Sequence, residues 1–334
     1  MTSAPDQLIP ALTAKARATA HARPAPCPCG AATLADRPDA TVVRHGDTVA
    51  KAHPPGTADT ELTSRLAVAA SHPRILLPPL APAPLHLHGR LVTLWPHGVP
   101  VDPDDPDAAP WEAAATLLAR LHRTPAPEGL PPMRGPAKAA HAVARLREAV
   151  APHLTAARHP TAAGDPGADQ DLLAAVAPVL RAWDTLPAWA RAESPMPGSA
   201  TLCHGDLHLG QLVRHPAPDG AWLLIDVDDL GTGVPAWDLA RPAAWYACGL
   251  LPPEAWTRFL AAYREAGGPA VPADGDPWPA LDVPARALTV QTAARAVAKA
   301  VAAGRALDEV ERAVVDACGR MTALPPQLAQ DHAK

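Results

Sequence analysis

Two carboxylates and one amide in this sequence have a spacing that suits the transfer of a phosphoryl group. Asp206 lies in the stretch 203–211, Gln211 follows five residues later, and Asp226 comes fifteen residues after that, at the end of an apolar run. In phosphoryl transfer the protein mainly positions groups and spreads charge, and an aspartate meets the attacking hydroxyl. Gln211 and Asp226 would supply the hard oxygen ligands that suit Mg²⁺. Gly205 would let the backbone turn tightly before Asp206.

A polar turn between two strands is the structural alternative, with His204 and His208 as hydrogen-bonded structural histidines. A lone His-Gly-Asp triplet would favour that alternative. Here a second aspartate follows at a kinase-like distance on the apolar run 221–225, so the functional interpretation is favoured. Asp228 is either a substrate contact or a second metal ligand, and His208 is a further substrate candidate.

A lysine in an expected β-hairpin completes the pattern. Residues 41–52 alternate as two short strands around a turn, and Lys51 stands in the second strand, where a kinase places the lysine that pairs with the α- and β-phosphates. Glu61, on a helix that begins near residue 58, is expected to form an ion pair with Lys51. The alternatives are a surface lysine and a first-turn glutamate favoured by the helix dipole. No glycine-rich loop precedes the hairpin, so residues 35–40 are expected to cover the phosphates.

Three motifs together resemble the aminoglycoside phosphotransferase and choline-kinase-like superfamily, over residues from about 40 to about 265. They are His204-Gly205-Asp206-Leu207-His208, then Ile225-Asp226, then Pro235-Ala236-Trp237-Asp238-Leu239-Ala240. Two departures stand out, because Gln211 replaces the family's usual Asn and Val234 replaces the aspartate of its usual Gly-Asp-Pro. The Leu-Gly-Gln ending of the loop is similar to that of the maltokinase and glucosamine-kinase branch.

The resemblance implies an α+β, bilobal, protein-kinase-like fold. A small β-rich N-terminal lobe that binds nucleotide would cover residues 1–97, and a larger helical lobe for catalysis and substrate binding would cover residues 98–334. Residues 231–233 would be a flexible, short substitute for an activation segment.

The spacing of apolar residues itself predicts several helices. One covers residues 6–20, with Leu8, Ile9, Leu12 and Ala16 near one face, and others cover residues 111–122, 137–157 and 168–192.

Roles for four further residues come from the same resemblance. Asp238 would brace the catalytic loop through hydrogen bonds, and His204 would support it. Leu94 and Trp95 lie where the last strand leads into the hinge, so backbone groups there would bind the purine and Trp95 would line its pocket. For Trp95, an ordinary core position is an equal alternative.

Composition narrows the setting of the protein. The net charge of −5 over 334 residues argues against a nucleic-acid surface. No apolar run of about 18 residues or basic, apolar leader is evident, so we expect no membrane segment and a cytoplasmic location, as a monomer or dimer. Cys27 and Cys29 are closer together than the first cysteine pair of most zinc sites, and no second pair follows, so metal binding is not expected there.

These observations predict a Mg²⁺-dependent enzyme that transfers the γ-phosphate of ATP or GTP to a hydroxyl of a small, sugar-containing molecule. The resemblance implies an antibiotic as acceptor, for example an aminoglycoside or a nucleoside antibiotic such as a capuramycin, and therefore a role in resistance. A metabolic kinase of the glucosamine or maltose type is the first alternative. The second is a pseudokinase module that binds nucleotide without turnover.

Overall fold

A computed structural model describes residues 4–21, 27–37, 39–158, 166–198 and 201–323. Its contacts divide the chain into two compact units. Unit 1 comprises Met1–Leu117, Pro127–Pro131 and Leu209–Leu230, and unit 2 comprises Leu118–Ala126, Pro132–His208 and Gly231–Lys334. Within the described ranges we find no helix whose length and hydropathy would let it span a lipid bilayer.

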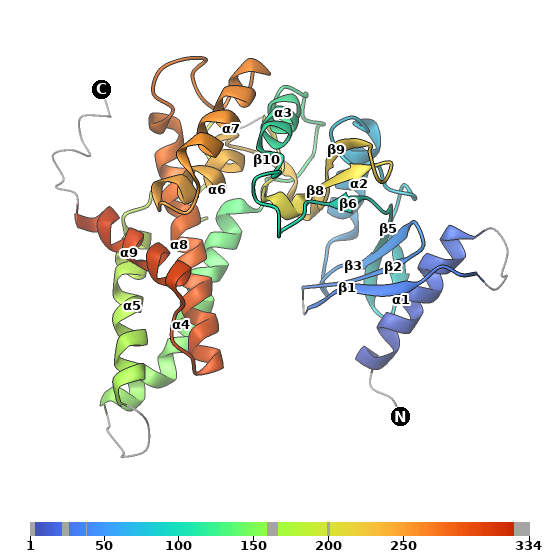
Figure 1. Ribbon diagram of the computed structural model, residues 1–334. Coiled ribbons are helices and arrows are strands. Elements are labelled where there is room, and N and C mark those ends of the chain that lie inside the picture. The colour runs from blue at the N-terminus through green and yellow to red at the C-terminus, as the bar shows by residue number, and fades with distance from the viewer. Residues whose placement is uncertain (1–3, 22–26, 38, 159–165, 199–200, 324–334) are drawn as a thin grey trace. The chain divides into compact units, whose positions relative to one another are not determined.

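An antiparallel sheet with the strand order β1-β2-β3-β5-β4 dominates the first part of unit 1 (Figure 1). Its strands are β1 (Ala31–Arg37), β2 (Ala40–His45), β3 (Thr48–Ala52), β4 (Leu85–Leu87) and β5 (Arg90–Pro96). Buried and half-buried residues alternate along β2 and β3, as expected when one face of a strand packs on a core. The hairpin predicted over residues 41–52 is therefore confirmed.

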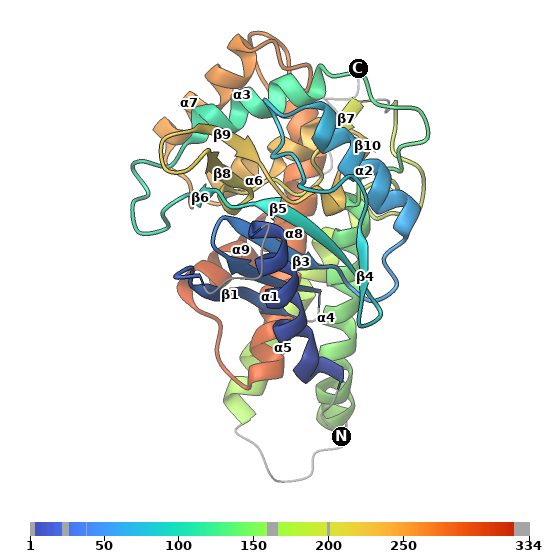
Figure 2. The same ribbon diagram turned by 90° about the vertical axis from the view of Figure 1, so that its right-hand side faces the viewer.

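Helix α1 (Ala4–Ala20) lies against this sheet and contacts β2 and β3 (Figure 2). Leu8, Leu12 and Ala16 share one face of the helix and pack with Val43 and Leu94 in a buried cluster. The spacing of these apolar residues predicted this face. Burial of that face holds the helix on the strands that carry Lys51.

A second, three-stranded sheet completes unit 1, with the order β6-β8-β9. Its strands are β6 (Val99–Pro100), β8 (Leu212–His215) and β9 (Ala221–Leu224), and helix α2 (Asp59–Ser71) precedes the segment that pairs with β9. Because β6 pairs with β8, the segment 209–230 folds with unit 1. The units therefore do not follow the lobe boundary that the sequence placed after residue 97.

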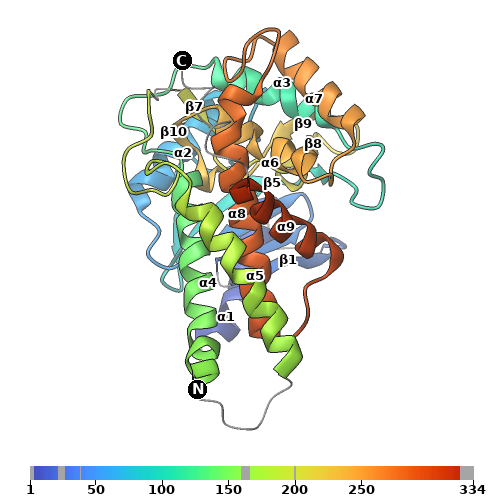
Figure 3. The ribbon, with the colours of Figure 1, turned by 90° about the vertical axis from the view of Figure 1, so that its left-hand side faces the viewer.

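Six helices and a small two-stranded sheet form most of unit 2. The helices are α4 (Gly135–Arg158), α5 (Pro166–Asp184), α6 (Ala236–Ala247), α7 (Pro253–Glu265), α8 (Trp278–Ala303) and α9 (Glu309–Ala323). Helix α8 contacts α4, α5, α6 and α9, and Figure 3 shows α4, α5, α8 and α9 side by side. Helix α3 (Trp111–His122), which has the predicted bounds, ends in unit 2.

Two details of unit 2 differ from the sequence predictions. The helix expected to reach residue 192 ends at Asp184, and turns follow it. Residues 231–233 form strand β10, which pairs with β7 (Thr201–Cys203), so this segment is not a flexible loop. The pairing places the β10 backbone next to the strand that leads into the His-Gly-Asp loop.

Candidate active site

A buried carboxylate of unit 2 holds the loop that follows β7. Asp238, in the first turn of α6, is 1% exposed. It accepts hydrogen bonds from the backbone N–H groups of His204, at 2.6 Å, and Gly205, at 2.7 Å. These hydrogen bonds are the contacts through which the predicted bracing of the loop would act. The side chain of His204 is fully buried.

A third donor reaches Asp238 from helix α3. His122 Nε2 donates to Asp238 Oδ2 at 2.9 Å, and His122 Nδ1 lies 2.7 Å from the hydroxyl of Tyr263. The Tyr263 hydroxyl in turn accepts from the backbone N–H of Ala270 at 3.0 Å. Burial raises the pKa of Tyr263, so its proton stays in place to donate to His122. The loop is thus supported by a chain of hydrogen bonds within unit 2.

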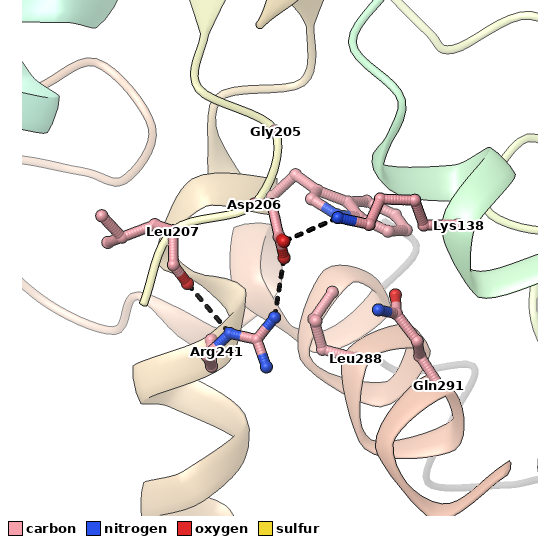
Figure 4. A pocket seen from close by; sticks show the side chains of 8 residues that line it. Lys138, Gly205, Asp206, Leu207, Arg241, Leu288 and Gln291 are labelled. Carbon is pink, nitrogen blue, oxygen red and sulfur yellow. Dashed lines mark hydrogen bonds and ion pairs between the residues drawn. The ribbon is translucent and has the colours of Figure 1, made fainter. Parts of the chain in front are cut away.

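Asp206 lies between two cations of the same unit. Lys138 Nζ, on α4, is 2.6 Å from Asp206 Oδ2, and Arg241, on α6, is 2.8 Å from Oδ1 (Figure 4). Arg241 also donates from Nε to the carbonyl of Leu207 at 2.9 Å. Gly205 precedes Asp206 with a φ of +86°, a conformation that glycine adopts without steric cost, so the predicted tight turn is confirmed.

The two cations set the ionisation of Asp206. Burial alone would raise its pKa, but the charges of Lys138 and Arg241 outweigh burial, and half-buried His208 adds to them, so the pKa is lowered. Each carboxylate oxygen can accept more than one hydrogen bond, which leaves Asp206 able to accept one from a hydroxyl. Asp206 is therefore ionised at neutral pH, so it can orient a hydroxyl but is a weak base.

A small pocket opens beside Asp206, and all of its walls belong to unit 2 (Figure 4). It is lined by Lys138, Gly205, Asp206, Leu207, Trp237, Arg241, Leu288 and Gln291. Asp206 is the one acid among these residues, against two permanent cations. The lining therefore carries a net positive charge.

The second group of candidate residues lies in unit 1, around Lys51. Its Nζ is 2.7 Å from Asp226 Oδ1 and 3.0 Å from Asp228 Oδ2. Burial would lower the pKa of Lys51, but the two carboxylates outweigh burial and raise it. Burial would likewise raise the pKa of Asp228, and Lys51 with His53 lowers it. Lys51 and Asp228 are thus held in their charged forms.

Gln211 and Asp226 also meet in unit 1, as their spacing suggested. Gln211 Nε2 donates to Asp226 Oδ2 at 3.2 Å, and Asp226 has a positive φ of 66° as the cap of the short 3₁₀ turn Val227–Asp229. Non-glycine residues rarely adopt this conformation, and it is found at functional sites where the surroundings hold it. Two carboxylates and an amide oxygen are hard donors, so this set fits Mg²⁺.

A hydrogen-bonded chain behind Asp228 was not anticipated. His53 Nδ1 lies 3.2 Å from Asp228 Oδ2, and His53 Nε2 lies 2.8 Å from the hydroxyl of Thr93. Trp95 donates its indole N–H to the same hydroxyl at 2.8 Å and is largely buried. The structure therefore gives Trp95 a supporting contact in the core, and its predicted contact with a purine stays a prediction.

Glu61 and Leu94 are placed differently from the predictions. Glu61 lies 3.3 Å from Arg65, one turn along α2, and Lys51 contacts two aspartates instead, so the described residues contain no Lys51–Glu61 ion pair. Leu94 lies inside β5, packs its side chain against α1, and accepts from the N–H of Leu80 at 2.8 Å. Its carbonyl is therefore already engaged by the segment that precedes β4.

Comparison with known proteins identifies the family. A model of the phosphotransferase enzyme family matches residues 34–282 of the chain. The chain belongs to this family. The predicted superfamily and small-molecule phosphotransferase activity are thereby confirmed, whereas none of the curated proteins compared with the chain matches it.

Solved structures of phosphotransferases and kinases share the fold. Spectinomycin phosphotransferase APH(9)-Ia, in complex with ADP and spectinomycin, has a TM-score of 0.58 at 14% identity, over 88% of this chain and 89% of that chain. A choline/ethanolamine kinase family protein from Mesorhizobium loti has a TM-score of 0.52 at 18% identity, over 96% and 98%. The predicted α+β, kinase-like fold is therefore confirmed.

Residues that the sequence did not reveal in this phosphotransferase are the partners of the predicted ones. Lys138, Arg241, His122 and His53 are separated from the carboxylates they contact by 35 to 175 residues. Arg241, however, also stands three residues after Asp238. Helical spacing places positions three apart on one side of a helix, so Arg241 could have been linked to the Asp238 motif. The other three carried no comparable signal.

Replacing Asp238 by Asn should weaken the loop support of this phosphotransferase. The amide keeps one acceptor oxygen but presents an NH₂ group to a backbone donor, so the free energy of unfolding should fall by about 1.5–3 kcal/mol. Urea denaturation measures the change. Asp282→Asn, on the exposed side of α8, is the matched control, and equal midpoints for the two variants would contradict the bracing role.

Replacing Lys138 by Met should raise the pKa of Asp206, because one of its two cations is removed. Since the folded pKa lies below the unfolded value of about 3.9, ionised Asp206 stabilises the fold above that pH, and this stabilisation is lost as the pH falls through the folded pKa. The variant should therefore unfold at higher pH on acidification. Carbon-13 NMR titration of the aspartate carboxyls measures the shift directly. Lys299→Met, an exposed lysine of α8, should leave it unchanged.

Proposed function

We propose that this phosphotransferase transfers the γ-phosphate of ATP or GTP to a hydroxyl of an uncharged or acidic, sugar-containing small molecule. A nucleoside antibiotic of the capuramycin type is the preferred acceptor, and the product would be inactive as an antibiotic. The observation that carries the choice of acceptor is the positively charged lining around Asp206, formed by Lys138 and Arg241.

The group in unit 1 suits the nucleotide side of the reaction. Lys51 is the strand lysine of the hairpin, and a cation there would pair with the phosphates in place of its present carboxylate partners. Asp226 and Gln211 would hold Mg²⁺, which neutralises charge on the phosphates when it is bound. Asp228 would be a second ligand, or would keep Lys51 positioned, and His53 keeps Asp228 oriented from behind.

The group in unit 2 suits the acceptor side. Asp206 stays ionised, so it would accept a hydrogen bond from the acceptor hydroxyl and hold its oxygen toward the phosphorus. A weak base is sufficient, because the transition state of phosphoryl transfer is loose and proton removal can come late. Asp238, with His204 and Gly205, keeps the loop backbone from moving during this step.

The charge of the pocket decides between acceptor classes. An aminoglycoside carries several ammonium groups, and placing one beside Lys138 and Arg241 would add like-charge repulsion in a partly buried site. A neutral or anionic sugar moiety would instead accept hydrogen bonds from both cations and from the amide of Gln291, which lies in the same lining. This favours the nucleoside antibiotic over the aminoglycoside.

A metabolic sugar kinase is the second candidate, because the same pocket suits a neutral sugar such as maltose. It does not suit glucosamine equally well, since glucosamine carries an ammonium group. A pseudokinase module is less well supported, because Asp226 contacts both Lys51 and Gln211, which brings the candidate phosphate and metal ligands together.

Asp206→Asn tests the central role. With Mg²⁺, nucleotide and a turned-over acceptor, this variant should lose about 10²–10⁴-fold in kcat, the range for a positioned proton acceptor. Asp219→Asn, an exposed aspartate in the turn between β8 and β9, should keep full activity. Activity of Asp206→Asn equal to that of the control, with both variants folded by circular dichroism, would remove Asp206 from the mechanism.

An acceptor panel tests the charge argument. Each nucleotide is offered with a capuramycin, hygromycin B, maltose and glucosamine, and mass spectrometry detects the gain of one phosphoryl group. We expect phosphorylation of the capuramycin and none of hygromycin B. A higher kcat/KM for maltose than for the capuramycin would support the sugar-kinase function. Preferred phosphorylation of hygromycin B would refute the argument that the positive charge of the pocket disfavours aminoglycosides.

A further inference from the structure

Four side chains of the kinds that can ligate a metal gather at one end of the five-stranded sheet in unit 1, and none of them is assigned to phosphoryl transfer. His21 directly follows α1, Cys27 and Cys29 precede β1, and His45 is the last residue of β2. One ligand atom from each lies within 4.8 Å of all the others. All four residues belong to the same compact unit.

The contacts inside this Cys-His cluster match a tetrahedral site in type and in distance. Cys27 Sγ lies 3.2 Å from His45 Nε2, and the two imidazole rings stand edge to face with their centroids 5.5 Å apart. Around one Zn²⁺ ion, sulfur and nitrogen ligands at their usual bond lengths are separated by about 3.3–3.8 Å. The cluster would need only small side-chain movements to reach that geometry.

Burial gives a second, independent indication of a ligand. His45 is 5% exposed and its Nδ1 is buried without a hydrogen-bond partner among the described residues; the same holds for Nε2 of His21. A buried polar atom without a partner costs free energy, so such atoms are usually satisfied by protein, water or an ion. A metal ion bound by His21 Nε2 would satisfy that nitrogen, and it would bind His45 through Nε2, the nitrogen next to Cys27 Sγ.

The turn after His45 is shaped to receive Cys29. Gly46 has a φ of +56°, and a Cβ atom placed there would lie 3.5 Å from Cys29 Sγ. The backbone N–H of Gly46 also donates to the carbonyl of Gly30 at 3.4 Å. This backbone hydrogen bond holds the segment with the two cysteines against the β2–β3 turn, and it brings the sulfur of Cys29 close to the imidazole of His45.

We propose that these four side chains bind one structural Zn²⁺ ion. Two thiolates and two imidazoles suit zinc, and a site with four protein ligands leaves no position for substrate, so its role is structural. The ion would connect the end of α1 to the turn of the hairpin that carries Lys51. Three of the ligands lie before residue 34, where the family match begins, so the site is additional to the part of the chain that the family describes.

A second group of possible ligands does not support a metal. His122, Cys203 and Asp238 also lie close together in unit 2. Both oxygens of Asp238 already accept hydrogen bonds from the loop backbone, and both ring nitrogens of His122 have partners. Their polar atoms need no ion, in contrast to those of His21 and His45.

Metal analysis of the full-length protein tests the proposal without any activity assay. Protein produced with zinc in the medium should contain about one zinc per chain. Replacement of the zinc by Co²⁺ should produce a thiolate-to-cobalt charge-transfer band. Cys29→Ser and His45→Asn should lose zinc and that band. Cys248→Ser, a half-buried cysteine of unit 2, and His86→Asn, an exposed histidine of β4, should keep both.

Thermal unfolding gives a second readout that does not depend on how the variants fold. Removal of zinc from the wild-type protein by a chelator should lower Tm, and added Zn²⁺ should restore it, since a ligand that binds only the folded state stabilises it. Wild-type protein that holds no zinc after zinc supplementation and gives no cobalt band would overturn the proposal. So would stoichiometric zinc in Cys29→Ser, or a Cys27–Cys29 disulfide in protein purified under reducing conditions.

Discussion

One buried carboxyl group governs the geometry of the His-Gly-Asp loop. A carboxyl group as deeply buried as that of Asp238 is tolerated only when donors surround it. Two of those donors are consecutive backbone N–H groups of the loop, so satisfying Asp238 and shaping the loop are the same event. Asp206 follows directly, and its position is therefore a consequence of a carboxylate 32 residues further along the chain. His122 completes the donor set and links the loop to α3.

Charge is arranged differently around two of the candidate aspartates, Asp206 and Asp228. Asp206 faces two cations that come from separate helices, and both remain beside it as part of the pocket. Asp228 faces a lysine that has another expected task, because a strand lysine of this type serves the phosphates. The cations beside Asp206 would form a fixed electrostatic environment for an acceptor. The carboxylates beside Lys51 hold its ammonium group in place. When nucleotide binds, Lys51 would contact the phosphates and the carboxylates would contact Mg²⁺.

The sequence predicted the parts of this molecule that are encoded over short distances. Apolar periodicity placed α1, α3 and the β2–β3 hairpin, because each buries one face and the period of that face can be read locally. The spacing of Asp206, Gln211, Asp226 and Asp238 lies within one stretch of the chain and carries the family resemblance. Contacts between distant segments carried no such signal, which is why Lys138 and His53 were missed and Glu61 was assigned to the wrong partner.

The Cys-His cluster is a second case in which contacts between separate segments could not be predicted from the sequence. The two cysteines were judged against spacing patterns in which all ligands follow one another in regular pairs, and by that criterion they failed. Zinc requires four ligands in a tetrahedral arrangement, and their order along the chain does not matter. Here the ligands come from a helix end, a short segment before β1 and a strand end. They lie close together because α1 packs on β2 and β3, and His45 is the last residue of β2. The packing of an apolar helix face, which periodicity does predict, is therefore what brings the imidazole of His21 to the thiols, and a ligand search becomes informative only once that packing is known.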